Sequence, residues 1–302
     1  MNAVTGVFSY TGNHIARRLL ADGEQVRTLS RAPDPDHPLA DQVEFARLQF
    51  DDPIELLDAL AGVDTLYNTY WVRYARGETT WQKVVDNTAM LLRAAGAAGV
   101  SRVVHVSVTR AAPDSPLDYY RHKALTEQIV REAPLSYAIV RPTLVFARGD
   151  ILLNNIAWLM RRFPLFVVPG DGSYPVQPVA ARDVAALCVE AARRSEDLEW
   201  DAAGPATYSY EELVRVLHAS VHSRARIVHA RPGAALALGR LVGGARRDTL
   251  LTRPELDGLM DGLLTSPEPP RGMTRIEDWL AGAGGGLGRD YASERRRNWS
   301  GD

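Results

Sequence analysis

The chain has 302 residues, a formal net charge of −2 and one cysteine. This length suits one large α/β domain, alone or with a small additional lobe. The charge balance does not favour a nucleic-acid partner, and no apolar run reaches the length that a bilayer requires, so neither nucleic acid nor a membrane is expected. Cys188 cannot form an internal disulfide and fits a reducing compartment. We therefore expect a cytoplasmic protein, with no signal peptide.

The first two-thirds of the chain alternates β-branched runs with helical patterns, which is typical of βαβ units and a parallel sheet. In chain order the spacing predicts a strand, a helix closed by Gly23 and a second strand. Asp52 and Pro53 open the next helix. The predicted strands cover residues 1–4, 25–30, 43–50, 65–69, 102–108 and 136–141, and the other helices cover 14–22, 82–98 and 119–132.

After about residue 150 the pattern changes. It predicts helices over 151–162 and 182–194, a loop over 168–172, and a mainly helical remainder from about 205. The charged cluster Glu294–Arg297 is interpreted as a solvated helix end. The predicted fold is α/β, a Rossmann-type doubly wound parallel sheet with a small, mostly helical C-terminal lobe.

A glycine turn lies between the first strand and the first helix. Gly6 suits the tight turn, and Gly12 allows the helix to pack close to the sheet. Such a turn aims backbone amides and a helix N-terminus at an anion, typically a dinucleotide pyrophosphate. Ser9 stands where a middle glycine is usual, and its side chain either crowds the pyrophosphate or donates a hydrogen bond to it. A purely structural turn is the alternative interpretation.

The second strand ends in Ser30 and Arg31, with no acidic residue. A carboxylate at this position favours NAD by binding the ribose 2′-hydroxyl, whereas a guanidinium binds a 2′-phosphate. The sequence therefore favours NADP(H) as the cofactor, with NAD(H) possible. An ordinary surface arginine is the alternative.

Tyr119 and Lys123 are four residues apart on a predicted helix, so both lie on one face. A nearby ammonium stabilises a phenolate, which suits the tyrosine to acid–base work. Ser107 and Thr109 follow a buried strand and supply hydroxyls for a substrate carbonyl or alcohol. Tyr120 is the competing tyrosine, and an exposed helix start is the alternative.

These residues together resemble the short-chain dehydrogenase/reductase superfamily. The similarity is to its atypical or extended branch, which is epimerase/dehydratase-like and NmrA-like, and it spans roughly residues 1–220. The resemblance implies a dinucleotide-binding domain at 1–150, to which 173–200 return, and a substrate-binding lobe at 151–172 and 201–302. It implies a catalytic role for Thr109, Tyr119 and Lys123. The cofactor-binding residues that it implies, together with Ser30, are Gly6, Ser9, Tyr10, Gly12, Arg31, Asn68, Thr69, Ser107, Lys123, Pro142 and Thr143.

The chain departs from the family pattern at three places. Ser9 replaces a glycine, and Gln49 stands where an acid often contacts adenine. Only ten residues separate Thr109 from Tyr119, which is short for a sugar-nucleotide epimerase. The aromatic segment 67–74 suits either a substrate wall, with Arg73 for an anion, or internal packing.

Three functions remain open from the sequence. The first is an NADP(H)-dependent oxidoreductase acting on a small carbonyl or alcohol. The others are an epimerase or dehydratase of a nucleotide sugar, and a non-catalytic dinucleotide sensor or assembly protein. The partner is a small-molecule substrate, and a homodimer is possible. The scattered histidines show no metal-ligand spacing, so no metal is expected.

Overall fold

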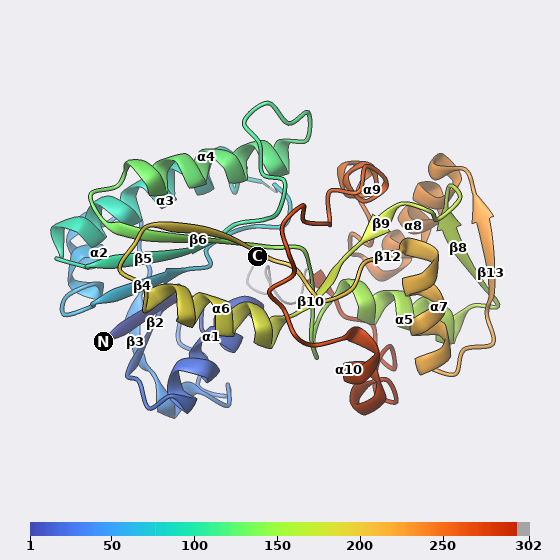
Figure 1. The fold of residues 1–302 in the computed structure, drawn as a ribbon, viewed down its shortest axis with the longest axis horizontal. Coiled ribbons are helices and arrows are strands. Elements are labelled where there is room, and N and C mark those ends of the chain that lie inside the picture. The colour runs from blue at the N-terminus through green and yellow to red at the C-terminus, as the bar shows by residue number, and fades with distance from the viewer. Residues whose placement is uncertain (76, 295–302) are drawn as a thin grey trace. The chain divides into compact units, whose positions relative to one another are not determined.

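A computed structural model of the chain describes residues 1–75 and 77–294. It forms two compact units, shown in Figure 1. Unit 1 comprises residues 1–142 and 181–202, and unit 2 comprises residues 143–180 and 203–302. Within the charged cluster Glu294–Arg297, residues 295–297 lie outside the described residues.

Unit 1 is built on a seven-stranded sheet with the order β11-β6-β5-β4-β1-β2-β3. Every neighbouring pair is parallel. This arrangement confirms the predicted Rossmann-type doubly wound fold. Its elements are β1 (Asn2–Thr5), α1 (Tyr10–Ala21), β2 (Val26–Ser30), η1 (Ala40–Gln42), β3 (Glu44–Arg47), α2 (Pro53–Ala59), β4 (Thr65–Asn68), α3 (Trp81–Ala97), β5 (Arg102–Val106), α4 (Asp118–Glu132), β6 (Ser136–Pro142), α6 (Ala181–Ala192) and β11 (Leu198–Ala202).

Helices cover both faces of this sheet (Figure 1). α1 packs beside α6 on one face, and α3 packs beside α4 and α2 on the other. The central strand β5 is buried along its whole length, as a parallel strand covered on both faces must be. Apolar side chains from β1, β5 and α3, among them Ala3, Val103 and Leu91, are fully buried in one core.

The strand order reverses direction between β1 and β4. β1 pairs with β2 on one side and with β4 on the other. The chain therefore winds outward in both directions from this pair, and a crevice is expected beyond the carboxyl ends of the two strands. The candidate site lies at this reversal.

Two elements of unit 1 differ from the sequence prediction. The first helix begins at Tyr10 rather than at residue 14, because Ser9 already has the extended conformation of an N-cap. Strand β11 was not predicted at all. It alternates polar and apolar residues beside an acidic stretch, and its place at the sheet edge depends on long-range partners such as Arg102, which donates to Glu196 O at 2.9 Å.

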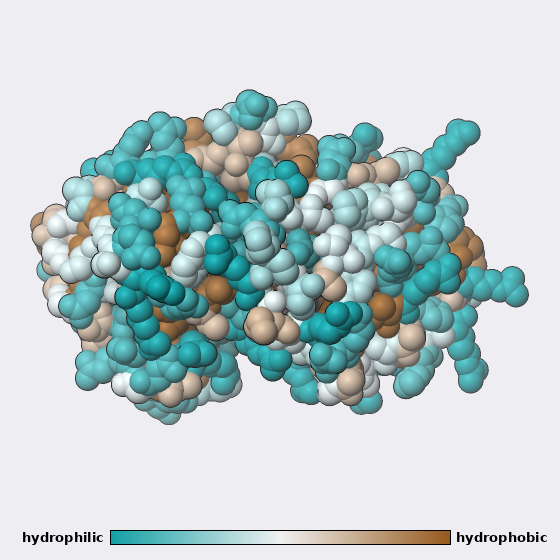
Figure 2. Space-filling model, viewed as in Figure 1, coloured by the Kyte–Doolittle hydropathy of each residue, from teal (hydrophilic) through white to brown (hydrophobic). Residues whose placement is uncertain are grey.

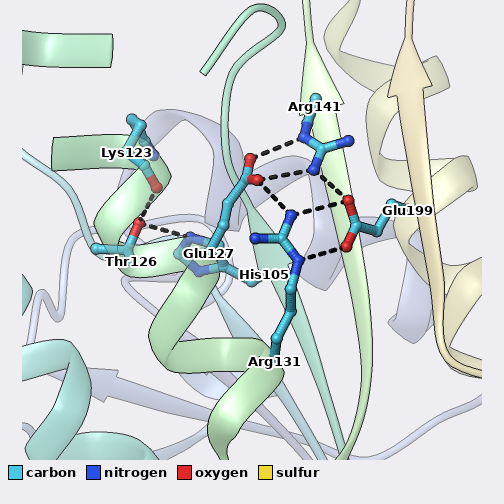
Figure 3. A network of polar contacts seen from close by, with 7 residues as sticks. All are labelled: His105, Lys123, Thr126, Glu127, Arg131, Arg141 and Glu199. Atoms are coloured by element: carbon cyan, nitrogen blue, oxygen red, sulfur yellow. Dashed lines mark hydrogen bonds and ion pairs between the residues drawn. The ribbon is translucent and has the colours of Figure 1, made fainter. Parts of the chain in front are cut away.

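A network of four charged side chains joins α4 to the outer strands β6 and β11 (Figure 3). The carboxylate of Glu127, 2% exposed, accepts two hydrogen bonds from Arg141, at 2.8 and 2.7 Å, and one from Arg131 at 2.9 Å. Glu199 accepts two from Arg131, at 2.6 and 2.9 Å, and another from Arg141. Two negative and two positive charges thus offset one another, which the burial of Glu127 requires.

Unit 2 combines helices with three pairs of strands, β7·β10, β8·β13 and β9·β12. Residues 168–172 were predicted as a loop, but β8 continues to Pro169 and the turn begins at Gly170, whose φ of +64° favours glycine. The remainder from about 205 also contains two strands. The elements are β7 (Leu144–Phe146), α5 (Leu152–Arg162), β8 (Leu165–Pro169), β9 (Pro175–Val176), β10 (Pro178–Ala180), β12 (Tyr208–Ser209), α7 (Tyr210–Ser220), β13 (Arg226–Ala230), α8 (Pro232–Arg246), α9 (Arg253–Met260) and α10 (Ile276–Ala283).

The surface is mainly polar on the face shown in Figure 2, where apolar residues appear in small groups. Unit 2 has its own apolar core, with Phe146, Leu153 and Leu217 fully buried in it. Within residues 1–75 and 77–294, none of the helices is long and apolar enough to span a membrane.

The charge network predicts an acid-sensitive contribution to stability. The hydrogen bond from Arg131 lowers the pKa of Glu199 to about 2, although partial burial opposes this. A carboxyl whose pKa falls on folding stabilises the protein above its unfolded pKa, and this stabilisation is lost as the pH falls through the folded pKa. Glu199→Gln should therefore lower the free energy of unfolding at pH 7 by about 1–3 kcal/mol. Denaturant unfolding between pH 7 and pH 2 should show the difference from wild type shrinking below about pH 4.5; a constant difference would contradict this origin.

Candidate dinucleotide site at the carboxyl edge of the sheet

Polar side chains join the ends of β1 and β4 where the strand order reverses. The Thr5 hydroxyl oxygen accepts from Thr69 N at 2.7 Å, and the Thr69 hydroxyl donates to Thr5 O at 2.6 Å. Asn68, fully buried, accepts from Tyr70 N at 3.1 Å through Oδ1. The predicted site residues Asn68 and Thr69 therefore lie directly beside the strand that leads into the glycine turn.

The glycine turn has the tight geometry that the sequence predicts. Gly6 has a φ of +71°, which favours glycine, and its amide donates to Leu29 O at 2.8 Å. A Cβ on Gly12 would lie 2.2 Å from Gly6 O, so only glycine lets α1 start this close to the turn. Asn13 is the first residue of α1 whose amide reaches back to the N-cap, donating to Ser9 O at 3.0 Å. The helix N-terminus at this turn is the kind of position at which backbone N–H groups bind an anion.

Ser9 uses its hydroxyl within the turn. Its Oγ donates to Gly6 O at 2.6 Å, and its amide donates to the same carbonyl at 2.8 Å. The side chain is exposed and bends back over the turn. For Ser9 to donate a hydrogen bond to a pyrophosphate, its hydroxyl must therefore first break the bond to Gly6 O. Tyr10 follows as the first residue of α1, with its ring edge-on to His14 at 5.7 Å.

The end of β2 places Ser30 and Arg31 at the same edge of the sheet. Ser30 Oγ lies 2.8 Å from Thr28 Oγ1, which in turn accepts from Val7 N at 3.2 Å. Arg31 is exposed. Burial raises the pKa of Tyr70, and the hydrogen bond from Asn87 and the charge of Arg31 oppose that rise. The positive charge of Arg31 thus acts on the aromatic segment that follows β4.

Tyr119 and Lys123 occupy successive turns of α4, and Trp71 from the aromatic segment contacts both. The Trp71 ring lies over Lys123 Nζ at 4.2 Å from its centroid, and edge-on to Tyr119 at 5.6 Å. The Lys123 ammonium also donates to Val106 O at 2.9 Å. The lysine is 3% exposed, so the structure buries a side chain that is normally solvated.

Burial changes the acid–base character of Lys123. Loss of solvation lowers its pKa to about 7, and the charge of Glu127 opposes this fall only in part. The nearby Trp71 face favours the charged ammonium. Lys123 is therefore poised to gain or lose a proton near neutral pH when a ligand changes its surroundings.

Several polar groups around Lys123 have unused hydrogen-bonding capacity. Ser107 Oγ and Trp71 Nε1 are buried and have no hydrogen-bond partner in the part of the chain that the structure describes. Lys123 Nζ has three donors, of which one reaches Val106 O. Since unpaired buried polar atoms are costly, these atoms favour a ligand rich in hydroxyls and other acceptors. The ribose and carboxamide groups of a nicotinamide dinucleotide fit this requirement.

The remaining predicted residues occupy the ends of β5 and β6. Thr109 is fully buried, and its amide donates to Pro142 O at 3.1 Å. Pro142 is the last residue of β6 and of the first segment of unit 1. Thr143 opens unit 2, where its hydroxyl donates to Gln177 O at 2.5 Å. The structure thus brings the predicted residues of unit 1 to one sheet edge, while Thr143 belongs to the other unit.

Three residues were missed as parts of the site: Trp71, His105 and Thr126. Trp71 was considered only within the aromatic segment, in which Tyr67 is 1% exposed and Tyr70 accepts a hydrogen bond from Asn87 at 2.9 Å. His105 lies in the apolar run of β5, where a polar residue is itself a signal. Thr126 shows no such signal, because threonine is common on helices that pack against a sheet.

No metal centre is found among residues 1–75 and 77–294, where no three His, Cys, Asp or Glu side chains gather closely enough to hold an ion. The groups at the sheet edge are a glycine turn, a helix N-terminus and a set of hydrogen-bond donors. That combination suits a phosphorylated organic ligand.

A family model described as NAD(P)H-binding matches residues 8–195, more than half of the chain. The chain belongs to this NAD(P)H-binding family. The match covers most of unit 1 and agrees with the glycine turn and the strand order. It confirms the resemblance to the atypical or extended branch of the short-chain dehydrogenase/reductase superfamily.

Individual proteins extend this similarity. The chain is 26% identical over 307 residues to a ceramide reductase of Caulobacter vibrioides, covering 93% of this chain and 95% of the relative. It is 25% identical over 238 residues to the mitochondrial NADH dehydrogenase 1 alpha subcomplex subunit 9 of Arabidopsis thaliana, covering 74% of this chain but only 59% of that relative. A Citrobacter triphenylmethane reductase solved with NADP(H) has the same fold, with a TM-score of 0.74, 19% identity, and coverage of 93% of this chain and 99% of that one.

Gly12→Ala tests the glycine turn. The new Cβ would meet the Gly6 carbonyl, so the helix start must move away from the anion site. We expect the affinity for NADPH to fall by about 100-fold or more, as for the loss of several charge-assisted hydrogen bonds. Gly244→Ala on α8 is the control, because its Cβ would meet nothing within 4 Å. Calorimetric titration of both variants measures the effect, and similar affinities would exclude a role for the turn.

The lowered pKa of Lys123 predicts that the protein takes up protons when it binds NADPH. The folded pKa of Lys123 is below the unfolded one, so burial of the ammonium costs stability below about pH 7, and this cost disappears as the pH rises toward 10.5. Ribose hydroxyls that accept from the ammonium would raise this pKa again, so binding at pH 8 should take up protons. Calorimetry of NADPH binding in two buffers of different ionisation enthalpy measures the uptake. Lys123→Met should abolish it, and equal uptake in this variant would assign the protons to another group.

Proposed function

We propose that this protein is an NADP(H)-dependent oxidoreductase that acts on a small carbonyl or alcohol substrate. The observation that carries the proposal is the cluster around Lys123. There a buried ammonium, a tyrosine on the preceding helical turn and the unpaired Ser107 hydroxyl lie at the carboxyl edge of a dinucleotide-binding sheet. Acid–base and binding groups converge there without a metal ligand set in the described part of the chain.

Each part of the edge has a binding role in this proposal. The turn from Gly6 to Gly12, with Ser9 and Tyr10, holds the pyrophosphate at the start of α1. Ser30 and Arg31 bind the 2′-phosphate, which favours NADP(H) over NAD(H). Asn68 and Thr69 lie beside the cofactor, and Ser107, Lys123 and Pro142 surround its nicotinamide ribose and ring, with Thr143 next to Pro142 in the chain.

The chain's own residues provide the proton chemistry. The bound nicotinamide supplies or accepts the hydride. Tyr119 donates a proton to the substrate oxygen during reduction and removes it during oxidation. Lys123 stabilises the phenolate by its charge and holds the ribose through donors that its bond to Val106 leaves available. Thr109 orients the substrate oxygen.

The relatives support a reductase in particular. A ceramide reductase aligns with nearly the whole of this chain, and a triphenylmethane reductase shares the fold. We propose that unit 2 binds the substrate, as in the sequence interpretation. A homodimer and a cytoplasmic location stay predictions.

A dinucleotide sensor is the second candidate, and the position of Trp71 favours it. The indole ring covers Lys123 Nζ at 4.2 Å, where a reacting cofactor needs access. If Trp71 stays there when NADPH binds, Tyr119 does not reach the substrate position. A structure of the complex distinguishes the two candidates by whether the Tyr119 hydroxyl lies near the nicotinamide C4 atom, where the substrate oxygen would accept its hydrogen bond. Epimerase or dehydratase activity on a nucleotide sugar stays a prediction.

Tyr119→Phe tests the catalytic assignment. The variant keeps the ring beside Trp71 but lacks the proton donor, so turnover should fall by about 100-fold or more, within the range for loss of a general acid. NADPH affinity should stay within about twofold of wild type. Tyr120→Phe, which changes the adjacent buried tyrosine, is the matched control. A panel of quinones, aldehydes and ketones with NADPH serves as the assay, and undiminished turnover in Tyr119→Phe would refute the assignment.

Arg31→Ala tests the cofactor preference. Wild type should bind NADPH more tightly than NADH, and the variant should lose most of that difference, because a guanidinium–phosphate pair is removed. A loss of about tenfold or more in NADPH affinity is expected, with NADH affinity little changed. Arg93→Ala is the control, because Arg93 is also exposed but lies on α3. Calorimetry of all three proteins with both dinucleotides measures these affinities. An equal loss of affinity for NADPH and NADH in Arg31→Ala would show that Arg31 does not bind the 2′-phosphate.

A further inference from the structure

A chain of hydrogen bonds runs through the core of unit 1, from β4 across β5 to α4. Asn68 Nδ2 lies 3.1 Å from His105 Nδ1, and His105 Nε2 lies 3.2 Å from Thr126 Oγ1. Thr126 Oγ1 donates to Lys123 O at 2.8 Å. Asn68, His105 and Thr126 are all fully buried. Figure 3 shows the α4 end of this chain, where Thr126 bridges His105 and the backbone of Lys123.

The direction of each hydrogen bond follows from its neighbours. Asn68 Oδ1 accepts from Tyr70 N, so the amide nitrogen faces the imidazole. His105 Nδ1 is then the acceptor, and Nε2 carries the proton. This N–H donates to Thr126 Oγ1, whose own proton goes to Lys123 O. Every polar atom in the chain thus has one consistent role.

His105 stays neutral in this arrangement. Its complete burial moves the pKa well below the ordinary value, and the charges of Lys123 and Arg141 act in the same direction. A neutral imidazole with one acceptor and one donor nitrogen is a rigid spacer between Asn68 and Thr126, set in β5 beside the middle strand β4 of the sheet. An apolar residue of this size would leave the Asn68 amide and the Thr126 hydroxyl without their partners.

Strand β5 consequently holds Lys123 at two points. The side chain donates from Nζ to Val106 O, and the backbone is connected through Thr126 to His105, the preceding residue of the same strand. These two attachments fix both ends of a long flexible side chain. They also connect the lysine to Asn68 at the end of β4, beside the glycine turn.

We propose that His105, acting through Thr126, is a positioning residue that fixes Lys123 for dinucleotide binding. The proposal rests on the proposed function, because it assumes that Lys123 contacts the bound cofactor. It assigns no chemical step to His105 itself. It implies that the length and hydrogen-bond pattern of the imidazole, rather than its charge, matter to the site.

Thr126→Val is the first test, because valine keeps the shape but removes the hydroxyl. Thr88→Val is the matched control: Thr88 is also fully buried, and its hydroxyl donates to Val84 O within α3 rather than to a residue of α4. Both variants should lose similar thermal stability. NADPH affinity should fall about tenfold in Thr126→Val and less than twofold in Thr88→Val, since a buried hydrogen bond in a network contributes about this much.

Substitution of His105 by a shorter or a longer amide side chain tests the hydrogen bonds of Nδ1 and Nε2 separately. His105→Gln places an amide near the Nε2 position and can still reach Thr126, whereas His105→Asn places one near Nδ1 and can reach only Asn68. NADPH affinity should recover in His105→Gln relative to His105→Phe, and His105→Asn should resemble His105→Phe. Recovery by neither or equally by both would overturn the role of Thr126.

Proton uptake on NADPH binding is a readout that general destabilisation does not move. Thr126→Val and His105→Phe should change the uptake at pH 8 toward that of Lys123→Met, while Thr88→Val keeps the wild-type value. If wild type does not bind NADPH, the proposed function fails. If wild type binds NADPH with proton uptake and Thr126→Val behaves as Thr88→Val does, the proposed function stands and the positioning role fails.

Discussion

The need to pair polar groups buried at the carboxyl ends of the central strands governs this site. β1, β4 and β5 lie inside a sheet covered on both faces, yet β1 ends in Thr5, β4 ends in Asn68, and Ser107 follows directly after β5. Water cannot satisfy these groups there, so each needs a partner in the protein or in a ligand. Thr5 and Asn68 are paired within the protein, whereas Ser107 Oγ has no partner among the described residues. The paired groups Thr5 and Asn68 therefore stabilise the site, whereas the Ser107 hydroxyl is left for the ligand that we propose.

Lys123 shows the same constraint for a charged group. Burial disfavours its ammonium, while the Trp71 face and the carbonyl of Val106 favour it. The pKa of Lys123 is therefore about 7, so its charged and neutral forms are both populated near neutral pH. A ligand that adds acceptors shifts this balance, which links binding to protonation.

The helix that carries Lys123 is itself held from two sides. The charge network of Glu127, Arg131, Arg141 and Glu199 holds α4 to the outer strands, and Thr126 holds it to β5. Since Lys123 and Glu127 are one turn apart, both attachments constrain the same stretch of helix. Positional accuracy of this kind is what a preorganised site requires.

The sequence by itself determined the class of fold and the position of the glycine turn, because both depend on local signals. Alternation of strands and helices implies parallel pairing. Gly6 is needed for its positive φ and Gly12 for its close approach to the Gly6 carbonyl, and both requirements lie within one short segment. It also placed Tyr119 and Lys123 on one helical face. Only the tertiary structure decided that Trp71 lies between them, that β11 completes the sheet, and that His105 bridges Asn68 to Thr126. These depend on residues far apart in the chain, whose contacts no local pattern encodes. The burial that lowers the pKa of Lys123 likewise exists only once the sheet and α4 have packed together.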